Sequence, residues 1–288
     1  MSTGVQYYKR KLWAYNFCIH NIKTGCGVMY IWNETIAKRG SVEITSCLRH
    51  YFEHFLDDIV KKLKMFSDNC SGQNKNINVV LACLQKIHEG RFTNIEHNFM
   101  EPGHSYLPCD RDFGHIEQKL RGIEVFSQSN YCDIIKACRI TKPFIVVNMS
   151  RSQFVDIEVL QATITNRTKT LCKFSKGKVF VYDANYKQGF SIHHSFNNTD
   201  PVKVRLQKGR KQSYDCNIFD LKNQNLPQKY ISPIKINVKK VEDLQVLLLY
   251  IPPHHKAFIE EVIAEQLNPS DLHDNDDHDP NDDFLDYC

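Results

Sequence analysis

Hydrophobic positions in the first 125 residues alternate in some segments and recur at helical spacing in others. Aromatic-rich runs at 12–20 and 28–34 predict two strands joined by a turn. Between residues 41 and 63, apolar side chains recur at three- and four-residue steps, which predicts a helix with Ser41 as its N-cap. Four more elements continue the pattern: strands at 64–68 and 94–100, and helices at 76–90 and from about Asp110.

The order of these elements predicts the fold class. Two strands followed by alternating helices and strands are typical of a mixed α/β layer with a sheet core. We therefore expect one mixed sheet flanked by helices over residues 10–125. In such sheets, ligand sites form beyond the carboxyl ends of the strands.

A second region, residues 126–265, predicts a smaller, basic α+β extension of this core. Two helices are expected across 241–263, broken at Pro252 and Pro253 because proline removes a backbone donor. The other expected elements are a short helix at 131–140, a strand at 143–149, and edge strands or a hairpin at 172–183 and 189–196.

The formal net charge of +4 conceals two regions of opposite charge. Residues 271–288 contain eight Asp and no Lys or Arg, whereas the rest of the chain holds 37 basic and 25 acidic residues, a net charge of +12. We expect the acidic segment 266–288 to be a disordered tail. A basic body suits a polyanionic partner such as DNA or RNA, although solubility alone would also account for it.

Cysteine usage and hydropathy indicate a nuclear or cytoplasmic protein. The eleven cysteines never occur as C-x-x-C, and their odd number argues against a complete disulfide framework. No apolar run is long enough for a membrane span, and the first residues lack the apolar core of a secretory signal. We expect reduced thiols and no membrane association.

The segment FSDNCSGQNKN, residues 66–76, places one acid and several amides directly after a predicted strand. One interpretation is an Asx-turn that leads into a helix N-cap. The other is that Asp68 faces a metal ion while neighbouring side chains contact a nucleic acid. The candidate contacts are Asn69, Gln73, Asn74 and Lys75.

A second acidic group lies at residues 103–117. Asp110 and Glu117 are seven residues apart and would share a helix face, whereas Asp112 would pair with Arg111 or with solvent. Gathered carboxylates are what Mg²⁺ or Mn²⁺ needs, and two such ions can promote phosphodiester chemistry. Alternatively, Asp110 caps the helix and Glu117 lies on its solvated face. A zinc site of His97, His104, Cys109 and His115 matches no finger spacing.

Several segments together resemble a transposase-derived family of insects and other animals that has an RNase H-like core. They are YIWNETIAKRGSVEITSCL, FSDNCSGQNKN, GHSYLPCDRDFGHIE, KPFIVVNMSRSQF and LLLYIPPHHKAF, within residues 10–260. The resemblance implies a DDE-type metal site in which Asp68 is the middle acid and Glu117, with Asp110, the late one. Here the first strand departs from that pattern, because no Asp or Glu lies between Lys11 and Glu34 and only Asn16, Asn21 and Asn33 could take the position.

The resemblance therefore implies a nuclease or transposase core, active or degenerate, that acts on DNA phosphodiester bonds with Mg²⁺ or Mn²⁺. The alternatives are an inactive nucleic-acid or chromatin binding protein and a protein-interaction module. The candidate catalytic residues are Asp68, Asp110, Glu117 and His104, and the candidate metal ligands are Asp68, Asp110, Glu117 and Asn21. The basic segment 203–211 adds candidate nucleic-acid contacts at Lys203, Arg205, Lys208, Arg210 and Lys211.

Overall fold

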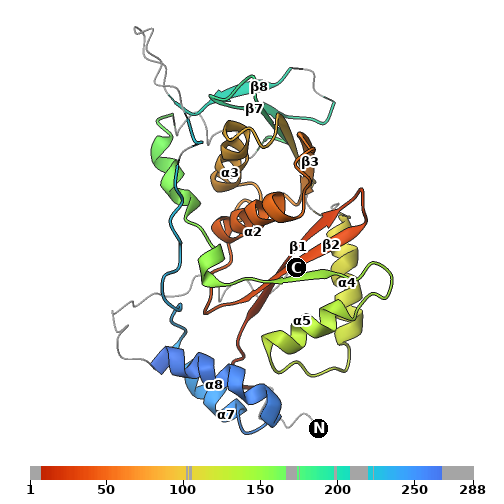
Figure 1. Ribbon diagram of the computed structural model, residues 1–288, viewed down its shortest axis with the longest axis vertical. Coiled ribbons are helices and arrows are strands. Elements are labelled where there is room, and N and C mark those ends of the chain that lie inside the picture. Colours follow the sequence, from red (N-terminus) through yellow and green to blue (C-terminus); the bar gives the residue numbers. More distant parts are fainter. Residues whose placement is uncertain are drawn as a thin grey trace.

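Two sheets organise the strands of the computed structural model (Figure 1). The described residues are 8–101, 103, 106–166, 174, 176–197, 200–207, 220–222 and 224–267. The first sheet has the order β1-β2-β5, with β1 antiparallel to β2 and β5 parallel to it. Its strands are β1 (Ala14–Asn21), β2 (Cys26–Asn33) and β5 (Ile145–Asn148).

The second sheet has five strands in the order β3-β4-β6-β7-β8. The β3–β4 pair is parallel, and the other neighbours are antiparallel. The strands are β3 (Lys62–Ser67), β4 (Asn94–Phe99), β6 (Val179–Asp183), β7 (Gly189–His193) and β8 (Val202–Arg205). The expected mixed α/β class is confirmed, but the expectation of one sheet is wrong, because β3 pairs with β4 and not with β1.

The α-helices match the predicted ones in place and differ at their ends, whereas the 3-10 helices η1 and η2 were not predicted. The helix predicted over 41–63 ends at His54, because the carboxylate of Asp57 accepts a hydrogen bond from the backbone of Ile59 and forms a turn before β3. Its N-cap is Gly40 rather than Ser41. The helical segments are α2 (Ser41–His54), α3 (Ile77–His88), α4 (Pro108–Leu120), α5 (Gln128–Lys136), η1 (Arg151–Gln153), η2 (Ile157–Thr163), α7 (Val238–Leu247) and α8 (Pro253–Leu267).

Three hydrophobic clusters hold these elements together. The largest joins the inner face of the five-stranded sheet to α2, α3 and one side of β2, with Trp32, Phe52 and Phe180 fully buried. The second packs α4 and α5 on the other side of the three-stranded sheet. The third lies within the α7–α8 pair at the end of the molecule opposite β8 (Figure 1). None of the helices in the described part is long and apolar enough to cross a membrane.

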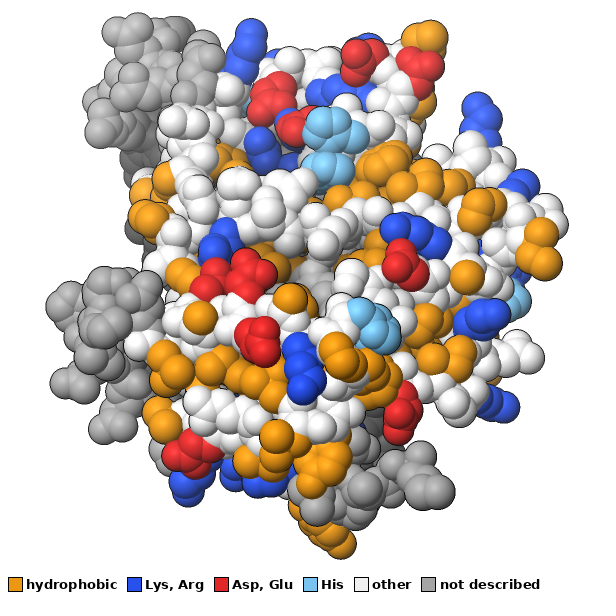
Figure 2. Space-filling model, turned by 60° about the horizontal axis from the view of Figure 1, so that its bottom comes forward, with side chains coloured by type: hydrophobic (Ala, Val, Ile, Leu, Met, Phe, Trp, Pro, Cys, Tyr) orange, Lys and Arg blue, Asp and Glu red, His pale blue; other side chains and the backbone are white. Residues whose placement is uncertain are grey.

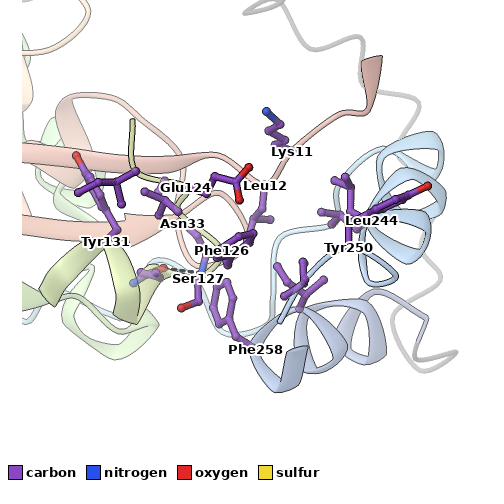
Figure 3. Close-up of a pocket in the computed structure, with 17 residues that line it drawn as sticks. Lys11, Leu12, Asn33, Glu124, Phe126, Ser127, Tyr131, Leu244, Tyr250 and Phe258 are labelled. Atoms are coloured by element: carbon purple, nitrogen blue, oxygen red, sulfur yellow. Dashed lines mark hydrogen bonds between the residues drawn. The ribbon is translucent and has the colours of Figure 1, made fainter. Parts of the chain in front are cut away.

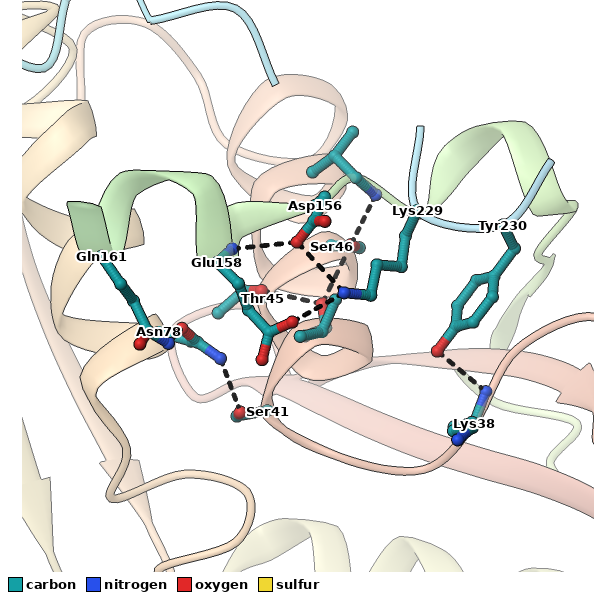
Figure 4. Close-up of polar contacts among 12 residues, drawn as sticks. Lys38, Ser41, Thr45, Ser46, Asn78, Asp156, Glu158, Gln161, Lys229 and Tyr230 are labelled. Atoms are coloured by element: carbon teal, nitrogen blue, oxygen red, sulfur yellow. Dashed lines mark hydrogen bonds and ion pairs between the residues drawn. The ribbon is translucent and has the colours of Figure 1, made fainter. Parts of the chain in front are cut away.

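A C-terminal segment around residues 227–230 is tied back to the main core by polar contacts (Figure 4). The Lys229 ammonium lies 2.6 Å from the Glu158 carboxylate and 3.3 Å from that of Asp156. The Tyr230 hydroxyl donates a hydrogen bond to Glu43, a buried carboxylate of α2. The hydrogen bond from Tyr230 stabilises the buried carboxylate of Glu43, which would otherwise be costly to remove from water.

Candidate functional site at the carboxyl ends of β3 and β4

The parallel strands β3 and β4 end at the same edge of the five-stranded sheet. The backbone N–H of Met100, directly after β4, donates to the carbonyl of Ser67, the last residue of β3. The loop 68–76 leaves from this edge and leads into α3. Because ligand sites in α/β sheets form beyond the carboxyl ends of parallel strands, this edge is the first candidate site.

Asp68 is exposed at the start of the loop and is held by its neighbours. Its Oδ1 accepts a hydrogen bond from the backbone N–H of Cys70 at 3.3 Å and one from Asn74 Nδ2 at 2.7 Å. Asn76 caps α3, because its side chain accepts from the backbone N–H of Asn78. The amide-rich sequence thus builds an Asx-turn and a helix cap, as the simpler interpretation predicts.

A buried histidine lies beneath the loop. His97 is 3% exposed, and its Nε2 is hydrogen-bonded to Ser67 Oγ at 2.9 Å. Burial lowers the pKa of His97 to about 3, so the imidazole is neutral near pH 7. Because the Ser67 hydroxyl donates to the carbonyl of Asp68, Nε2–H is the donor to Ser67 and Nδ1 is left as an acceptor.

Two polar atoms at this edge are buried without a hydrogen-bond partner in the described part of the chain. They are Nδ1 of His97 and Oδ1 of Asn69. Buried polar atoms in native proteins are normally paired with protein or with water. Both atoms are acceptors, so a water molecule or a ligand that brings N–H or O–H donors would satisfy them.

The other predicted contacts of the loop are less accessible than their sequence indicates. Lys75 is only 6% exposed, and its ammonium lies 5.2 Å from the centre of the Phe99 ring. Burial lowers the pKa of Lys75. Asn69, Gln73 and Asn74 are half-buried. Lys75 therefore contributes to packing beneath the loop, and nucleic-acid contact by these four residues stays a prediction.

Asp110 and Glu117, the two acids predicted to follow Asp68 in the metal site, both lie on α4 but have different surroundings. Asp110 accepts a hydrogen bond from the backbone N–H of Leu107 at 2.8 Å and so closes the N-terminus of the helix. Glu117 is exposed two turns further along. Seven residues at a rise of about 1.5 Å separate the two positions by about 10 Å along the axis. Sharing a helix face therefore does not bring the two carboxylates to one ion.

Asn21, the candidate first ligand, is the last residue of β1, and its side chain stabilises the turn to β2. Its Oδ1 accepts hydrogen bonds from the backbone N–H groups of Lys23 and Thr24, at 3.0 and 3.2 Å. Within the described ranges, no three His, Cys, Asp or Glu side chains are grouped closely enough to hold a metal ion. The expected Mg²⁺ or Mn²⁺ site of Asp68, Asp110 and Glu117 therefore stays a prediction.

Asp112 is the acidic residue of α4 that the structure places most unexpectedly. It is fully buried, and its carboxylate lies 2.5 Å from Nδ1 of His20 on β1 and 3.3 Å from the guanidinium of Arg139. The expectation that Asp112 pairs with Arg111 or solvent is wrong. The burial of Asp112 could have been predicted from the sequence, because Asp112 lies four residues before the apolar Ile116 and therefore on the same, packed face of α4.

The basic segment 203–211 begins within a strand, β8. Lys203 and Arg205 are exposed on β8, and the Lys203 ammonium lies 5.2 Å from the centre of the Tyr186 ring. Three of the predicted contacts, Lys208, Arg210 and Lys211, lie outside the described residues, as do His104 and residues 268–288 of the predicted acidic tail. The predicted start of that tail is wrong by two residues, because Gln266 and Leu267 belong to α8.

A cavity of 610 Å³ is a second candidate site (Figure 3). It lies between the start of α5 and the α7–α8 pair and is lined mainly by apolar side chains, including Leu244 and Phe258. Its polar lining includes the hydrogen-bonded pair Asn33 and Gln128. Hydrophobic side chains are frequent on the face that brings α7 and α8 toward the viewer (Figure 2). The charged residues among the described lining, Lys11 and Glu124, are both exposed, so this wall does not identify a ligand class.

The fold and these sites define a mixed α/β protein with two sheets and a polar edge beyond β3 and β4. The chain belongs to the family defined by a domain of unknown function, DUF7869, whose model matches residues 18–199. This range includes the 68–76 loop, His97 and Asp112, whereas β8, α7 and α8 lie beyond it. No curated protein and no solved structure matches the chain.

Proposed function

We propose that this protein binds nucleic acid and descends from an RNase H-like transposase core. The observation that carries the binding proposal is the placement of Lys203 and Arg205. Both are exposed on the edge strand β8, directly before a further basic stretch in the sequence. Phosphate contacts of this kind fix a polyanion without reading its sequence. The net charge of +12 outside the acidic tail supports the same partner.

The transposase ancestry is supported by where Asp68 lies. It follows a strand at the carboxyl edge of a parallel pair, as the middle acid of a DDE-type core would. The β1–β2 hairpin precedes it, and α4 with Asp110 and Glu117 follows it, in the order that the resemblance implies.

Binding without cleavage is the form of this function that the site supports best. Asn21 brings no negative charge to the first position, and its oxygen already accepts two backbone hydrogen bonds. Asp68 is tied to Asn74, and Asp110 is occupied as a helix cap. Losing one carboxylate from a two-metal site weakens both ion binding and catalysis.

The binding proposal is tested by fluorescence anisotropy with labelled oligonucleotides and the full chain. The double variant K203A/R205A should bind all sequences more weakly. The slope of log affinity against log salt should flatten by about 0.9 for each duplex phosphate that the variant no longer neutralises. A control variant, K119A/K239A, removes two exposed charges from α4 and α7 and should leave binding unchanged. Equal affinities of both variants and the unmodified chain would overturn the proposal.

A metal-dependent nuclease is the second candidate, favoured by the exposure of Asp68 at the strand end. Incubation of supercoiled DNA with the protein and Mg²⁺ or Mn²⁺ tests it. Cleavage that disappears in D68N and persists in D133N, an exposed acid of α5, would support the nuclease over the non-cleaving protein.

A further inference from the structure

The five-stranded sheet has one face in the core and one face turned outward. On the inner face, Leu63, Ile95 and Phe180 join the main core with α3. Side chains alternate along strands, so their sequence neighbours point to the other side. The helices α2 and α3 lie on the inner side (Figure 1). The outward side chains include Lys62, Lys64 and Phe66 of β3, Glu96 of β4, Val181 of β6, Ser191 of β7, and Lys203 and Arg205 of β8.

The register brings basic residues from distant parts of the sequence onto this one face. One row across the sheet runs from Lys64 through Glu96, Val181 and Ser191 to Lys203. At about 4.8 Å per strand, the two lysines lie on edges about 19 Å apart. The edge residues are exposed, whereas the middle of this row is half-buried. The face is therefore a solvent-accessible surface that is mainly polar and has basic side chains along both edge strands.

The acidic groups of this face already have partners. Glu96 forms an ion pair with Lys64 at 2.9 Å, and Asp183 accepts hydrogen bonds from Asn94 and from the backbone of Asn185. In contrast, no ion pair is found in the described part for Lys62, Lys203 or Arg205. The partners of Asp183 are neutral, so its charge remains, but four basic side chains (Lys62, Lys64, Lys203 and Arg205) face outward against two acidic ones (Glu96 and Asp183). The net charge of the face is positive, and its complement is a polyanion.

Two exposed aromatic side chains and one that is half-buried accompany this charge. Phe66 is 42% exposed on β3, although it lies in a strand whose other face is packed. Tyr186 lies beneath the Lys203 ammonium in the turn before β7. Phe196, just after β7, is 51% exposed beside Lys178. Aromatic faces that alternate with basic groups are the means by which proteins hold unstacked bases and their phosphates.

We propose that the outward face of the five-stranded sheet binds single-stranded nucleic acid. Phosphates would lie along Lys62, Lys203 and Arg205, and a base would stack on Phe66. A duplex fits less well, because its bases are stacked on each other and cannot reach an aromatic ring on a sheet. This inference rests on the proposed function and adds to it the surface and the strandedness of the partner.

The experiment compares a labelled single strand with the matching duplex by anisotropy in low salt, using the full chain. The unmodified protein should prefer the single strand. F66L keeps an apolar side chain but removes the ring, and should weaken single-strand binding about tenfold while changing duplex binding little. Y250L removes an exposed ring just after α7, a helix outside the five-stranded sheet, and serves as the matched control.

A charge variant of the same face gives a second, independent readout. K62A/R205A takes one cation from each edge of the sheet and should flatten the salt dependence of single-strand binding by about 1.4, which is about 0.7 per phosphate. Circular dichroism checks that both variants fold. Duplex preference, or unchanged single-strand binding by F66L and K62A/R205A, would overturn this inference and leave the proposed function intact. Absence of any nucleic-acid binding by the unmodified chain would instead overturn the proposed function.

Discussion

The carboxylate of Asp112 and the imidazole of His20 are joined at 2.5 Å inside the protein, and this pair fixes α4 to β1. Arg139 contacts the second oxygen of the same carboxylate. The three groups come from β1, from α4 and from the segment after α5, which lie far apart in the sequence. α4 also carries Asp110 and Glu117, so the buried pair sets where these two exposed acids stand.

Replacing Asp112 by Asn should strongly destabilise the fold. The substitution keeps the shape of the side chain but leaves His20 and Arg139 without their carboxylate, and breaking a buried pair costs about 3–5 kcal/mol. Urea denaturation followed by circular dichroism measures the loss. D133N, which removes an exposed carboxylate on α5, is the control and should cost under about 1 kcal/mol. Equal stability of the two variants would show that the Asp112 contacts contribute little.

His97 should make stability depend on pH. Its pKa is about 3 in the folded protein and about 6.5 in an unfolded chain, so the unfolded state takes up the proton first as the pH falls. The contribution is complete above about pH 6.5 and is lost progressively toward pH 3. At pH 5 the loss should be about 2 kcal/mol relative to pH 7.

The H97Q variant tests this assignment, since glutamine can still hydrogen-bond to Ser67 but does not titrate. Its free energy of unfolding should change less between pH 7 and pH 5 than that of the unmodified protein. The difference between the two pH profiles isolates His97 from the other titrating groups. Parallel profiles would show that another group carries the pH dependence.

The strands and helices can largely be predicted from periodicity, but their partners cannot. The pattern of β3 shows which side chains face a core and says nothing about which strand lies beside it, so the sequence predicts one sheet where two exist. β8 escapes prediction because it is short and half of its residues are basic. The overlong first helix has a local cause, because Phe55 and Ile59 continue the apolar spacing past the turn that Asp57 imposes.

The candidate site is predictable only where it is local. The Asx-turn at Asp68 and the cap at Asn76 follow from residue type and spacing. The burial of Lys75 beside Phe99, and the hydrogen bond between Ser67 and His97, depend on which strands become neighbours. For the same reason, the helical spacing of Asp110 and Glu117 does not show whether either reaches Asp68.

Restoring an acid at Asn21 tests the ancestry of the site. N21D should raise the affinity for Mn²⁺, because a carboxylate adds negative charge where a first-strand ligand would stand. The turn should tolerate it, since a carboxylate oxygen can accept the same backbone hydrogen bonds from Lys23 and Thr24. N237D is the matched control, because the side chain of Asn237 likewise accepts a backbone hydrogen bond, from Lys239 at the start of α7, and Asn237 is not a candidate for the first position. Calorimetry that finds no gain for N21D would tell against the alignment with a DDE-type core.

Removal of residues 271–288 should strengthen nucleic-acid binding several-fold at low salt. These residues carry eight Asp and no basic residue, so we expect them to compete with phosphates for the basic residues of the chain. Electrostatic competition of this kind weakens as salt screens the charges, and the gain should shrink between about 50 and 200 mM salt. A second chain with the eight Asp changed to Asn keeps the length of the segment and should behave like the truncation. If both variants match the unmodified protein at low salt, the acidic segment promotes solubility and does not regulate binding.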